Sequence, residues 1–319
     1  MHDRVLAIPL VRTGDHPSAE RRALQRRVHR GSLAPVRPGV LVDPSHLQGL
    51  RSEDRLLLLV RATTPSVELP RAFSHSSAAA VHGLPFVAPA PTRVDVLDPR
   101  LTRPETTALG RVRPGPEIDD THGRWAGTPP TLPIEIAGAP VTSLVRTLVD
   151  LSATAPLDDV VPMIDQALHD RRVLPEMLLD ELAAHVRKGY DKAGTAIGMG
   201  SALSGSPAES VCRVRFRQVG TPEPVQQHEF RRAGGGTAVV DFWFPDQGVV
   251  VEVDGRAKYE DPTMLDGRTT AEAHWQEKRR EDFVRSFPEV RFVVRLSWAD
   301  LMQPDRVRAA LRRAGVPCR

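Results

Sequence analysis

The chain has 319 residues, with 43 Lys and Arg against 40 Asp and Glu and a formal net charge of +3. This length is enough for two or three domains, each with a sizeable core. Because the net charge is small, any affinity for nucleic acid must come from local clusters of arginine. Two cysteines without zinc-ligand spacing exclude a disulfide framework and fit a reducing cytoplasm, and no apolar stretch approaches the roughly 20 residues of a membrane span.

Residues 15 to 44 are typical of a basic helix followed by a hairpin. Ser18 can cap the helix, Leu24 and Val28 point inward, and Gly31 ends it. The segment SLAPVRPGVLVDP then predicts a small hairpin that turns near Pro38. A basic helix with a β-wing is a helix-turn-helix type of DNA reader. The alternative is a solvated helix face. The arginines that we expect to contact DNA are Arg22, Arg26, Arg27, Arg30 and Arg37.

The run RRVHRGSLAPVRPGVLV resembles the winged-helix module of AbiEi-type abortive-infection antitoxins. The following SHSSAAAVHGLPFV matches the segment that usually succeeds that module. The resemblance implies a winged-helix region over 1–45, DNA as a partner, and a second partner from a toxin or defence system. His75 and His82 lie seven residues apart in this segment. Two histidines without a third ligand favour packing or capping over metal binding.

Residues 46 to 190 predict a mixed α/β middle region. RVDVLDP and LPIEIAG are expected strands, and VTSLVRTLVDLSA begins a helical stretch that continues to about His185. No P-loop, dinucleotide fingerprint or Ser-His-Asp signature occurs here. The Gly-, Ser- and Ala-rich residues 191–205 predict a linker, and 206–319 a C-terminal domain.

The C-terminal domain opens with a predicted helix from Ser206 to Gly220. Ser206 as N-cap, Pro207 at N1 and Glu209 at N3 form a capping box, and Gly220 suits a left-handed stop. This interpretation gives Glu209 a purely local role.

Two short strands, VVDFWF and VVVEVDG, flank the turn from Pro245 to Gly248. A hairpin that closes symmetrically about this turn sets Asp241 opposite Glu252, and Asp254 points to the same face because side chains alternate along a strand. The other face would carry an apolar set suited to a core. One face is therefore expected to be apolar and the other acidic.

Like charges opposed across two strands destabilise a hairpin, so the acidic face needs a compensating cation. A hard divalent ion, Mg²⁺ or Mn²⁺, held by Asp241, Glu252 and Asp254, removes the repulsion and gives the cluster a chemical use. The alternative is surface carboxylates paired with some of the many arginines.

Lysine is rare in this chain, which has only Lys188, Lys192, Lys258 and Lys278. The last two follow the acidic hairpin, where a lysine could orient or deprotonate a water while an arginine could not. The first two have no such neighbourhood, so rarity alone does not assign a role. A helix from about Ala271 to Phe287 also carries Arg279 and Arg280, which are expected to meet a phosphate backbone.

The pattern of Asp241, EVDG, RAKY, EKRRED and the strand RFVVRLSW resembles the very-short-patch-repair-endonuclease-like branch of the PD-(D/E)XK nuclease superfamily. The resemblance implies a restriction-endonuclease-like mixed sheet flanked by helices, with Asp241 and Glu252 as metal ligands. It also gives Glu209 a second reading, as an acidic residue of the site. Asp254 stands where the superfamily usually has Lys, so Lys258 or Lys278 would supply that function.

These observations predict a cytoplasmic α/β protein that acts on DNA, an Mg²⁺-dependent endonuclease in repair or defence. One rival is a non-cleaving antitoxin-like regulator with a degenerate nuclease fold, which Asp254 in place of Lys favours. The other is a retaining glycosidase, which also uses paired carboxylates. Sugar sites usually need aromatic platforms, and the chain is only 5% aromatic.

Overall fold

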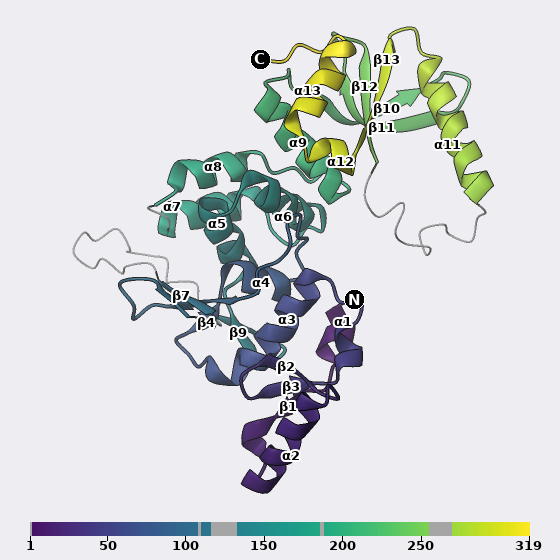
Figure 1. The fold of residues 1–319 in the computed structure, drawn as a ribbon. Coiled ribbons are helices and arrows are strands. Elements are labelled where there is room, and N and C mark those ends of the chain that lie inside the picture. The colour runs from purple at the N-terminus through teal and green to yellow at the C-terminus, as the bar shows by residue number, and fades with distance from the viewer. Residues whose placement is uncertain (1, 108–109, 116–132, 186–187, 255–269) are drawn as a thin grey trace. The chain divides into compact units, whose positions relative to one another are not determined.

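The computed structural model describes residues 2–107, 110–115, 133–185, 188–254 and 270–319 (Figure 1). It is a mixed α/β protein whose sheets are flanked by helices. Two compact units can be separated, Met1–Val160 with Val173–Gly198, and Val161–Arg172 with Met199–Arg319. None of the described helices is both long enough and apolar enough to cross a membrane.

The first unit begins with a helix, a short strand, a second helix and a hairpin. Its three strands form an antiparallel sheet in the order β1-β3-β2. Leu24, Leu33 and Leu41 make a small core that joins the second helix to this sheet. The elements are α1 (His2–Leu6), β1 (Val11–Arg12), α2 (Ser18–His29), β2 (Ala34–Arg37) and β3 (Val40–Val42), with a 3₁₀ turn at Thr13–Asp15.

The sequence predicted the helix α2 and the hairpin that follows it. Gly31 adopts a φ of +75° just after α2, and Arg37 pairs with Val40 around Pro38 and Gly39. One detail was wrong. The N-cap of α2 is Pro17, so Ser18 is the first helical residue and does not cap the helix.

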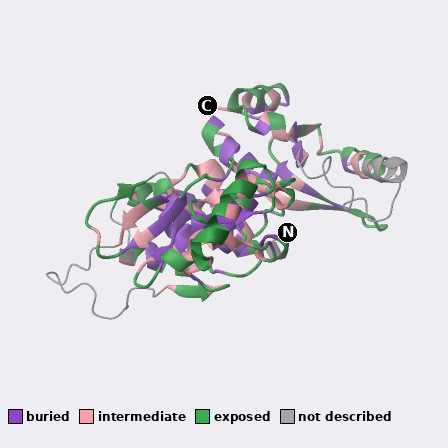
Figure 2. Cartoon of the chain, turned by 60° about the horizontal axis from the view of Figure 1, so that its bottom comes forward, coloured by how far each residue is buried: buried purple, intermediate pink, exposed green. Residues whose placement is uncertain are grey.

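The middle of the first unit is a six-stranded mixed sheet in the order β6-β7-β5-β4-β9-β8. Its core joins the apolar face of α3 to α4 and to the strands β4, β5 and β9, as the buried residues in Figure 2 show. The elements are α3 (Ser52–Thr63), β4 (Ala72–Phe73), α4 (His75–Val81), β5 (Val94–Asp98), β6 (Glu105–Thr106), β7 (Gly110–Pro114), β8 (Ile134–Ile136), β9 (Ala139–Val141) and α5 (Leu144–Thr154), with 3₁₀ turns at Pro44–Leu47 and Thr64–Ser66.

Three helices follow α5: α6 (Leu157–His169), α7 (Pro175–His185) and α8 (Tyr190–Gly198). The last of them lies largely within the segment that we expected to be a linker. Ala193, Ala196 and Ile197 are buried in it, at the spacing of one helical face. The glycines at 194 and 198 suggested flexibility, but this apolar stripe decides the local structure.

The second unit contains a four-stranded sheet in the order β10-β11-β12-β13. The first three strands are antiparallel neighbours, and β13 returns parallel to β12 after α11. Figure 1 shows α9 on one face of the sheet and α11 on the other. The elements are α9 (Pro207–Val219), β10 (Val225–Arg231), β11 (Thr237–Phe244), β12 (Val249–Asp254), α11 (Thr270–Arg285), β13 (Phe292–Ser297), α12 (Trp298–Leu301) and α13 (Pro304–Arg313).

Aromatic packing fixes α9 on this sheet. The Phe216 ring meets Phe242 and Phe244 edge-on, with centroids 5.1 and 5.4 Å apart. The opposite face is not purely acidic, as the alternation had predicted. Trp243 and Val250 are buried on it in a second cluster, which Phe283 and Phe287 join from α11 and its C-terminal end. The acidic residues therefore occupy only the end of that face furthest from the turn.

A buried aspartate with two exposed arginine partners lies at the end of β5 in the first unit. Asp98 is 2% exposed and accepts from Arg71 Nε at 2.7 Å and from Arg100 Nε at 2.9 Å. Hydrogen bonds from Arg100 and Arg71 hold the pKa of the Asp98 carboxyl far below its usual range, against the opposing effect of burial.

Because the folded pKa of Asp98 lies below the unfolded value of about 3.9, its contribution to stability is present above about pH 4 and lost as the pH falls. We expect Asp98→Asn to destabilise the first unit by roughly 1–3 kcal/mol at pH 7, by progressively less below about pH 4, and by least at strongly acidic pH, where the folded carboxyl also becomes protonated. Urea unfolding across this pH range measures this. Asp15→Asn, an exposed carboxylate of the same unit, is the matched control, and an equal loss at every pH would contradict the interpretation.

The turn between β11 and β12 depends on Gly248. Its φ is +66°, and a Cβ atom there would lie 2.5 Å from the Glu289 carbonyl oxygen. The same residue accepts backbone hydrogen bonds from Arg291 and Phe292, which bring β13 alongside β12.

We therefore expect Gly248→Ala to destabilise the protein by at least about 2 kcal/mol, since both the backbone strain and the overlap with Glu289 must be relieved. Gly234→Ala is the control, because a Cβ there meets nothing within 4 Å. That change should stay within about 0.5 kcal/mol. Chemical denaturation compares the two, and equal stability of both variants would be inconsistent with this role for the turn.

Candidate functional site

The β11–β12 register is the one that the sequence predicted. Phe244 pairs with Val249, Trp243 with Val250, and Phe242 with Val251. The pairing stops there, and Asp241 and Glu252 are the next residues on the two strands. The Asp241 Oδ2 atom accepts a hydrogen bond from the backbone N–H of Val253 at 2.8 Å. The side chain of Asp241 is thereby fixed against β12 where the regular pairing ends.

The row continues onto β10. Gln226 pairs with Phe242 and His228 with Val240, so Gln227 lies opposite Asp241. Gln227 has a φ of +49°, a left-handed conformation that is uncommon for a residue other than glycine. Its Nε2 atom donates to Glu209 Oε2 at 2.9 Å. Such local strain is often found at functional sites.

On the far side of β12 from β11, Glu252 has neighbours on the strand β13 and on the helix α11. Its Cα partner on β13 is Arg295. From α11, Arg280 Nη2 donates to Glu252 Oε1 at 2.9 Å, and the Glu252 side chain is only 14% exposed. Arg295 in turn donates to Glu281 at 2.8 Å. A polar row thus crosses all four strands, through Gln227, Asp241, Glu252 and Arg295.

Glu209 makes contacts at the start of its own helix, and it is also linked to the polar residues of the sheet. Ser206 Oγ accepts from the Glu209 N–H at 3.2 Å, as predicted for the N-cap. The Glu209 carboxylate accepts from Ser206 Oγ and from the Gly205 N–H, at 2.8 and 3.0 Å, rather than from the Ser206 N–H, so the N-cap is confirmed but the reciprocal bond of a capping box is replaced by these two. The bond from Gln227 also ties it to the row. Burial first, and then the charges of Asp241 and Glu209, raise the pKa of the Cys212 thiol well above its usual range. Both carboxylates therefore lie within electrostatic reach of one buried thiol.

The other expected site residues of this unit are less closely gathered. Asp254 is half-buried at the end of β12, on the face of Glu252. Lys258 lies outside the described residues, as do the side chains of residues 270–277. Lys278 is exposed on α11, and it lies two residues from Arg280. Two residues correspond to about 200° around a helix, so Lys278 and Arg280 leave different sides of α11.

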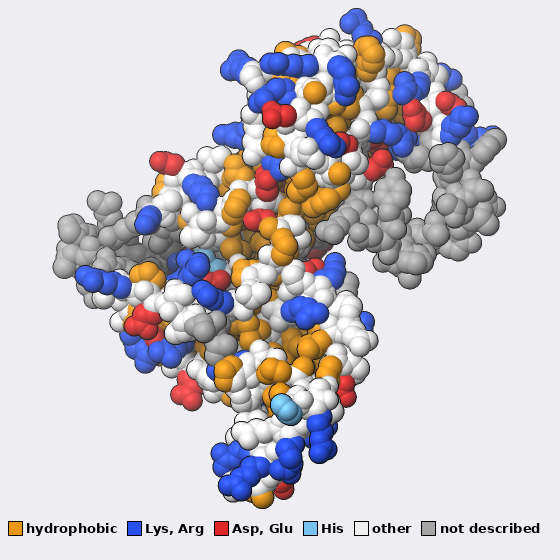
Figure 3. All heavy atoms as spheres, viewed as in Figure 1, with side chains coloured by type: hydrophobic (Ala, Val, Ile, Leu, Met, Phe, Trp, Pro, Cys, Tyr) orange, Lys and Arg blue, Asp and Glu red, His pale blue; other side chains and the backbone are white. Residues whose placement is uncertain are grey.

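The basic face of α2 is as the sequence predicted. Figure 3 shows its arginines gathered on the surface over α2, at the bottom of the view. Arg37 differs, because its Nε and Nη1 atoms are buried. Arg279 is exposed on α11, whereas Arg280 is turned to Glu252 instead of outward. The exposed residues of the α2 set are Arg22, Arg26, Arg27 and Arg30.

The two histidines of the middle region have structural neighbours. His82 Nε2 lies 2.9 Å from the Thr142 carbonyl oxygen, and His75 Nδ1 lies 3.1 Å from Ser74 Oγ. Within the described ranges, no group of three or more His, Cys, Asp or Glu side chains is placed to hold a metal ion.

Sequence reasoning missed Gln227 and the pairing of Arg280 with Glu252. No sequence motif marks Gln227, because its position in the site follows only from the register of β10. Arg280 was read as an outward charge. The one signal available was the need to neutralise Glu252, which had been weighed as an alternative.

Comparison of the chain with the known protein families gave no match, and comparison with curated proteins gave none either.

The donor chemistry of this row suits a hard divalent ion. Mg²⁺ usually binds proteins through one or two carboxylates together with waters and substrate phosphates, rather than through a complete cage. Asp241 and Glu252 supply two carboxylates on neighbouring strands. Arg280 occupies the Glu252 oxygens, so an ion that binds Glu252 must displace this guanidinium.

We expect Arg280→Gln to destabilise the protein by roughly 1–2 kcal/mol, because the half-buried Glu252 is then left without its counter-charge. Adding Glu252→Gln to that variant should recover most of the loss. Denaturant unfolding of the single and double variants measures the coupling. Arg217→Gln, an exposed arginine on α9, is the control. Additive losses in the double variant would contradict the pairing.

Proposed function

We propose that this protein acts on DNA as a divalent-metal-dependent endonuclease, with its centre at Asp241, Glu252 and Asp254. The observation that carries the proposal is the polar row across the C-terminal sheet. It gathers carboxylates from two strands, and the strained Gln227 links it to Glu209 on α9.

The architecture of the second unit supports this proposal. A mixed sheet with helices on both faces is what a restriction-endonuclease-like domain requires. The Asp241, EVDG and EKRRED elements, whose pattern resembles PD-(D/E)XK nucleases, lie on β11, on β12 and at its end, and on α11 respectively. The resemblance and the polar row thus both involve the two central strands, β11 and β12, which supports the proposal.

Asp241, Glu252 and Asp254 would hold Mg²⁺ or Mn²⁺ once their side chains draw together around the ion, since these described side chains do not form a three-ligand cluster beforehand. Such an ion, when bound, neutralises charge on the scissile phosphate and lowers the pKa of the attacking water. The N–H of Val253 keeps the Asp241 carboxylate aimed along the row. Arg280, once released from Glu252, is available to a phosphate oxygen, and Arg279 extends the basic surface of α11. Lys258 or Lys278 would orient or deprotonate the water.

The first unit would place the protein on DNA. A basic helix followed by an antiparallel hairpin supports a winged-helix module. The exposed arginines of α2 would contact phosphates, which position a protein on a duplex without reading its sequence. In this proposal the protein works in the cytoplasm, with a toxin or defence component as its partner.

A second candidate function has one specific observation in its favour. Arg280 already neutralises Glu252 through both carboxylate oxygens. With Asp254 in the position where the family usually has Lys, the same unit could bind DNA without cutting it, as an antitoxin-like regulator. The two candidates differ in whether the Arg280–Glu252 pair is exchanged for a metal ion.

Cleavage assays with plasmid, linear, mismatched and single-stranded DNA test the proposal directly. We expect cleavage that requires Mg²⁺ or Mn²⁺ and falls at least about 100-fold in Asp241→Asn and in Glu252→Gln, because each change removes a ligand charge. Asn at 241 retains an oxygen for the Val253 N–H, which limits structural damage.

Asp246→Asn is the matched control, since it removes the same charge at the exposed turn of the same hairpin. Its activity should equal that of the unaltered protein. Binding of DNA that weakens with salt, without cleavage of any substrate, would instead support the regulator.

A further inference from the structure

The first unit contains a cavity of about 430 Å³ between β5, β7, α4 and the C-terminal end of α5. It lies outside the acidic row, and no motif of the sequence pointed to it. Its size falls within the range of small-molecule sites. Leu151 and Pro91 supply the apolar part of the wall, and polar side chains come from the two strands and from α4.

The strand register concentrates charge on one wall. β5 and β7 are parallel neighbours with Asp95 paired to Arg111. Because side chains alternate along a strand, Arg93 and Asp95 share one face with Arg111 and Arg113. Three arginines therefore stand with one aspartate. Val94 and Val96, on the alternate positions, are buried in the core.

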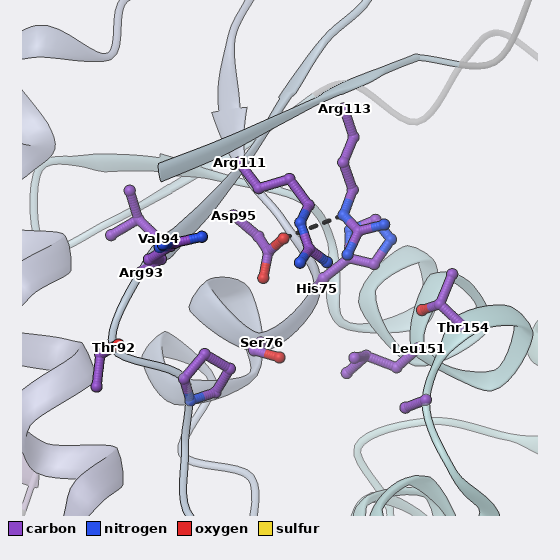
Figure 4. Close-up of a pocket in the computed structure, with 12 residues that line it drawn as sticks. His75, Ser76, Thr92, Arg93, Val94, Asp95, Arg111, Arg113, Leu151 and Thr154 are labelled. Carbon is purple, nitrogen blue, oxygen red and sulfur yellow. Dashed lines mark hydrogen bonds and ion pairs between the residues drawn. The ribbon is translucent and has the colours of Figure 1, made fainter. Parts of the chain in front are cut away.

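Asp95, the one aspartate among the described residues of this wall, already has an arginine partner. Arg113 Nε donates to Asp95 Oδ1 at 3.0 Å, so this pair is closed. Arg93 and Arg111 are exposed and make no ion pair with a carboxylate in the part of the chain that the structure describes. Figure 4 shows Arg111 and Arg113 reaching from β7 toward the same space beside Asp95 and His75. The wall therefore presents surplus positive charge.

His75 closes the inner end of the cavity. It is 7% exposed, has a φ of +47°, and begins α4. Burial lowers the pKa of its imidazole, which therefore stays neutral and can donate one hydrogen bond. Behind it, Asp150 pairs with Arg146 at 2.8 Å, so the nearest buried carboxylate has its own counter-charge.

We propose that this cavity binds a phosphate-bearing small molecule of nucleotide size, with its phosphate held by Arg93 and Arg111 and its remaining part against Leu151 and Pro91. Paired guanidinium groups are well suited to phosphate oxygens. A concave pocket of this volume, with polar and apolar walls, fits a small ligand, whereas a duplex requires an extended basic surface such as the face of α2. This binding function is independent of the proposed nuclease.

Isothermal titration of the full chain with adenosine monophosphate, inorganic phosphate and adenosine, at constant ionic strength, tests the proposal. We expect saturable binding of adenosine monophosphate, with weaker binding of phosphate alone and weakest binding of adenosine. Arg93→Gln and Arg111→Gln should each weaken binding of the nucleotide roughly ten-fold, as for loss of a charged hydrogen bond. Arg103→Gln, an exposed arginine of the same unit away from the cavity, should leave it unchanged.

Three results would overturn the proposal. One is no saturable binding of either phosphate-bearing probe, and another is equal weakening in Arg103→Gln. The third is a DNA duplex whose binding depends on Arg93 and Arg111 and excludes the nucleotide, because the cavity would then belong to a nucleic-acid surface. This test measures binding and not DNA cleavage. A negative result here can therefore be distinguished from a negative result for the nuclease proposal.

Discussion

Two half-buried carboxylates on neighbouring strands each need a compensating contact, and the C-terminal unit supplies one to each. Asp241 and Glu252 are brought together by the β11–β12 hairpin, and each carries a compensating contact: the N–H of Val253 for the first and Arg280 for the second. Arg280 lies on α11, which also packs Val284 against the sheet, with Phe283 beside it. The same helix therefore covers the apolar end of this face and neutralises its acidic end.

The rest of the row follows from register rather than from local sequence. The turn at Gly248 fixes how β11 meets β12, and its carbonyl accepts the backbone N–H groups that align β13. β10 then places Gln227 beside Asp241, in a left-handed backbone conformation that residues other than glycine rarely adopt. A shift of one residue in any of these strands would turn its polar residue to the other face of the sheet.

The sequence predicted the features that depend on a few neighbouring residues. The hairpin register, the Ser206 N-cap of α9 and the C-terminal ends of α2 and α9 at Gly31 and Gly220 all follow from short patterns with a direct physical cause. The helix α8 was missed because its glycines outweighed its three-residue apolar stripe. Arg280 and Gln227 could not be placed, since their partners lie 28 and 18 residues away along the chain.

The Arg280–Glu252 pair has a thermodynamic consequence for a protein that would bind both DNA and a divalent ion. A phosphate that attracts Arg280 frees Glu252, and an ion that takes Glu252 frees Arg280. Each ligand then lowers the cost of binding the other, and linkage requires the two effects to be equal. Under the proposed function, ion affinity is low in the free protein and rises when DNA is in place. In this way the Arg280–Glu252 ion pair would keep the proposed hydrolytic centre inactive until DNA is bound.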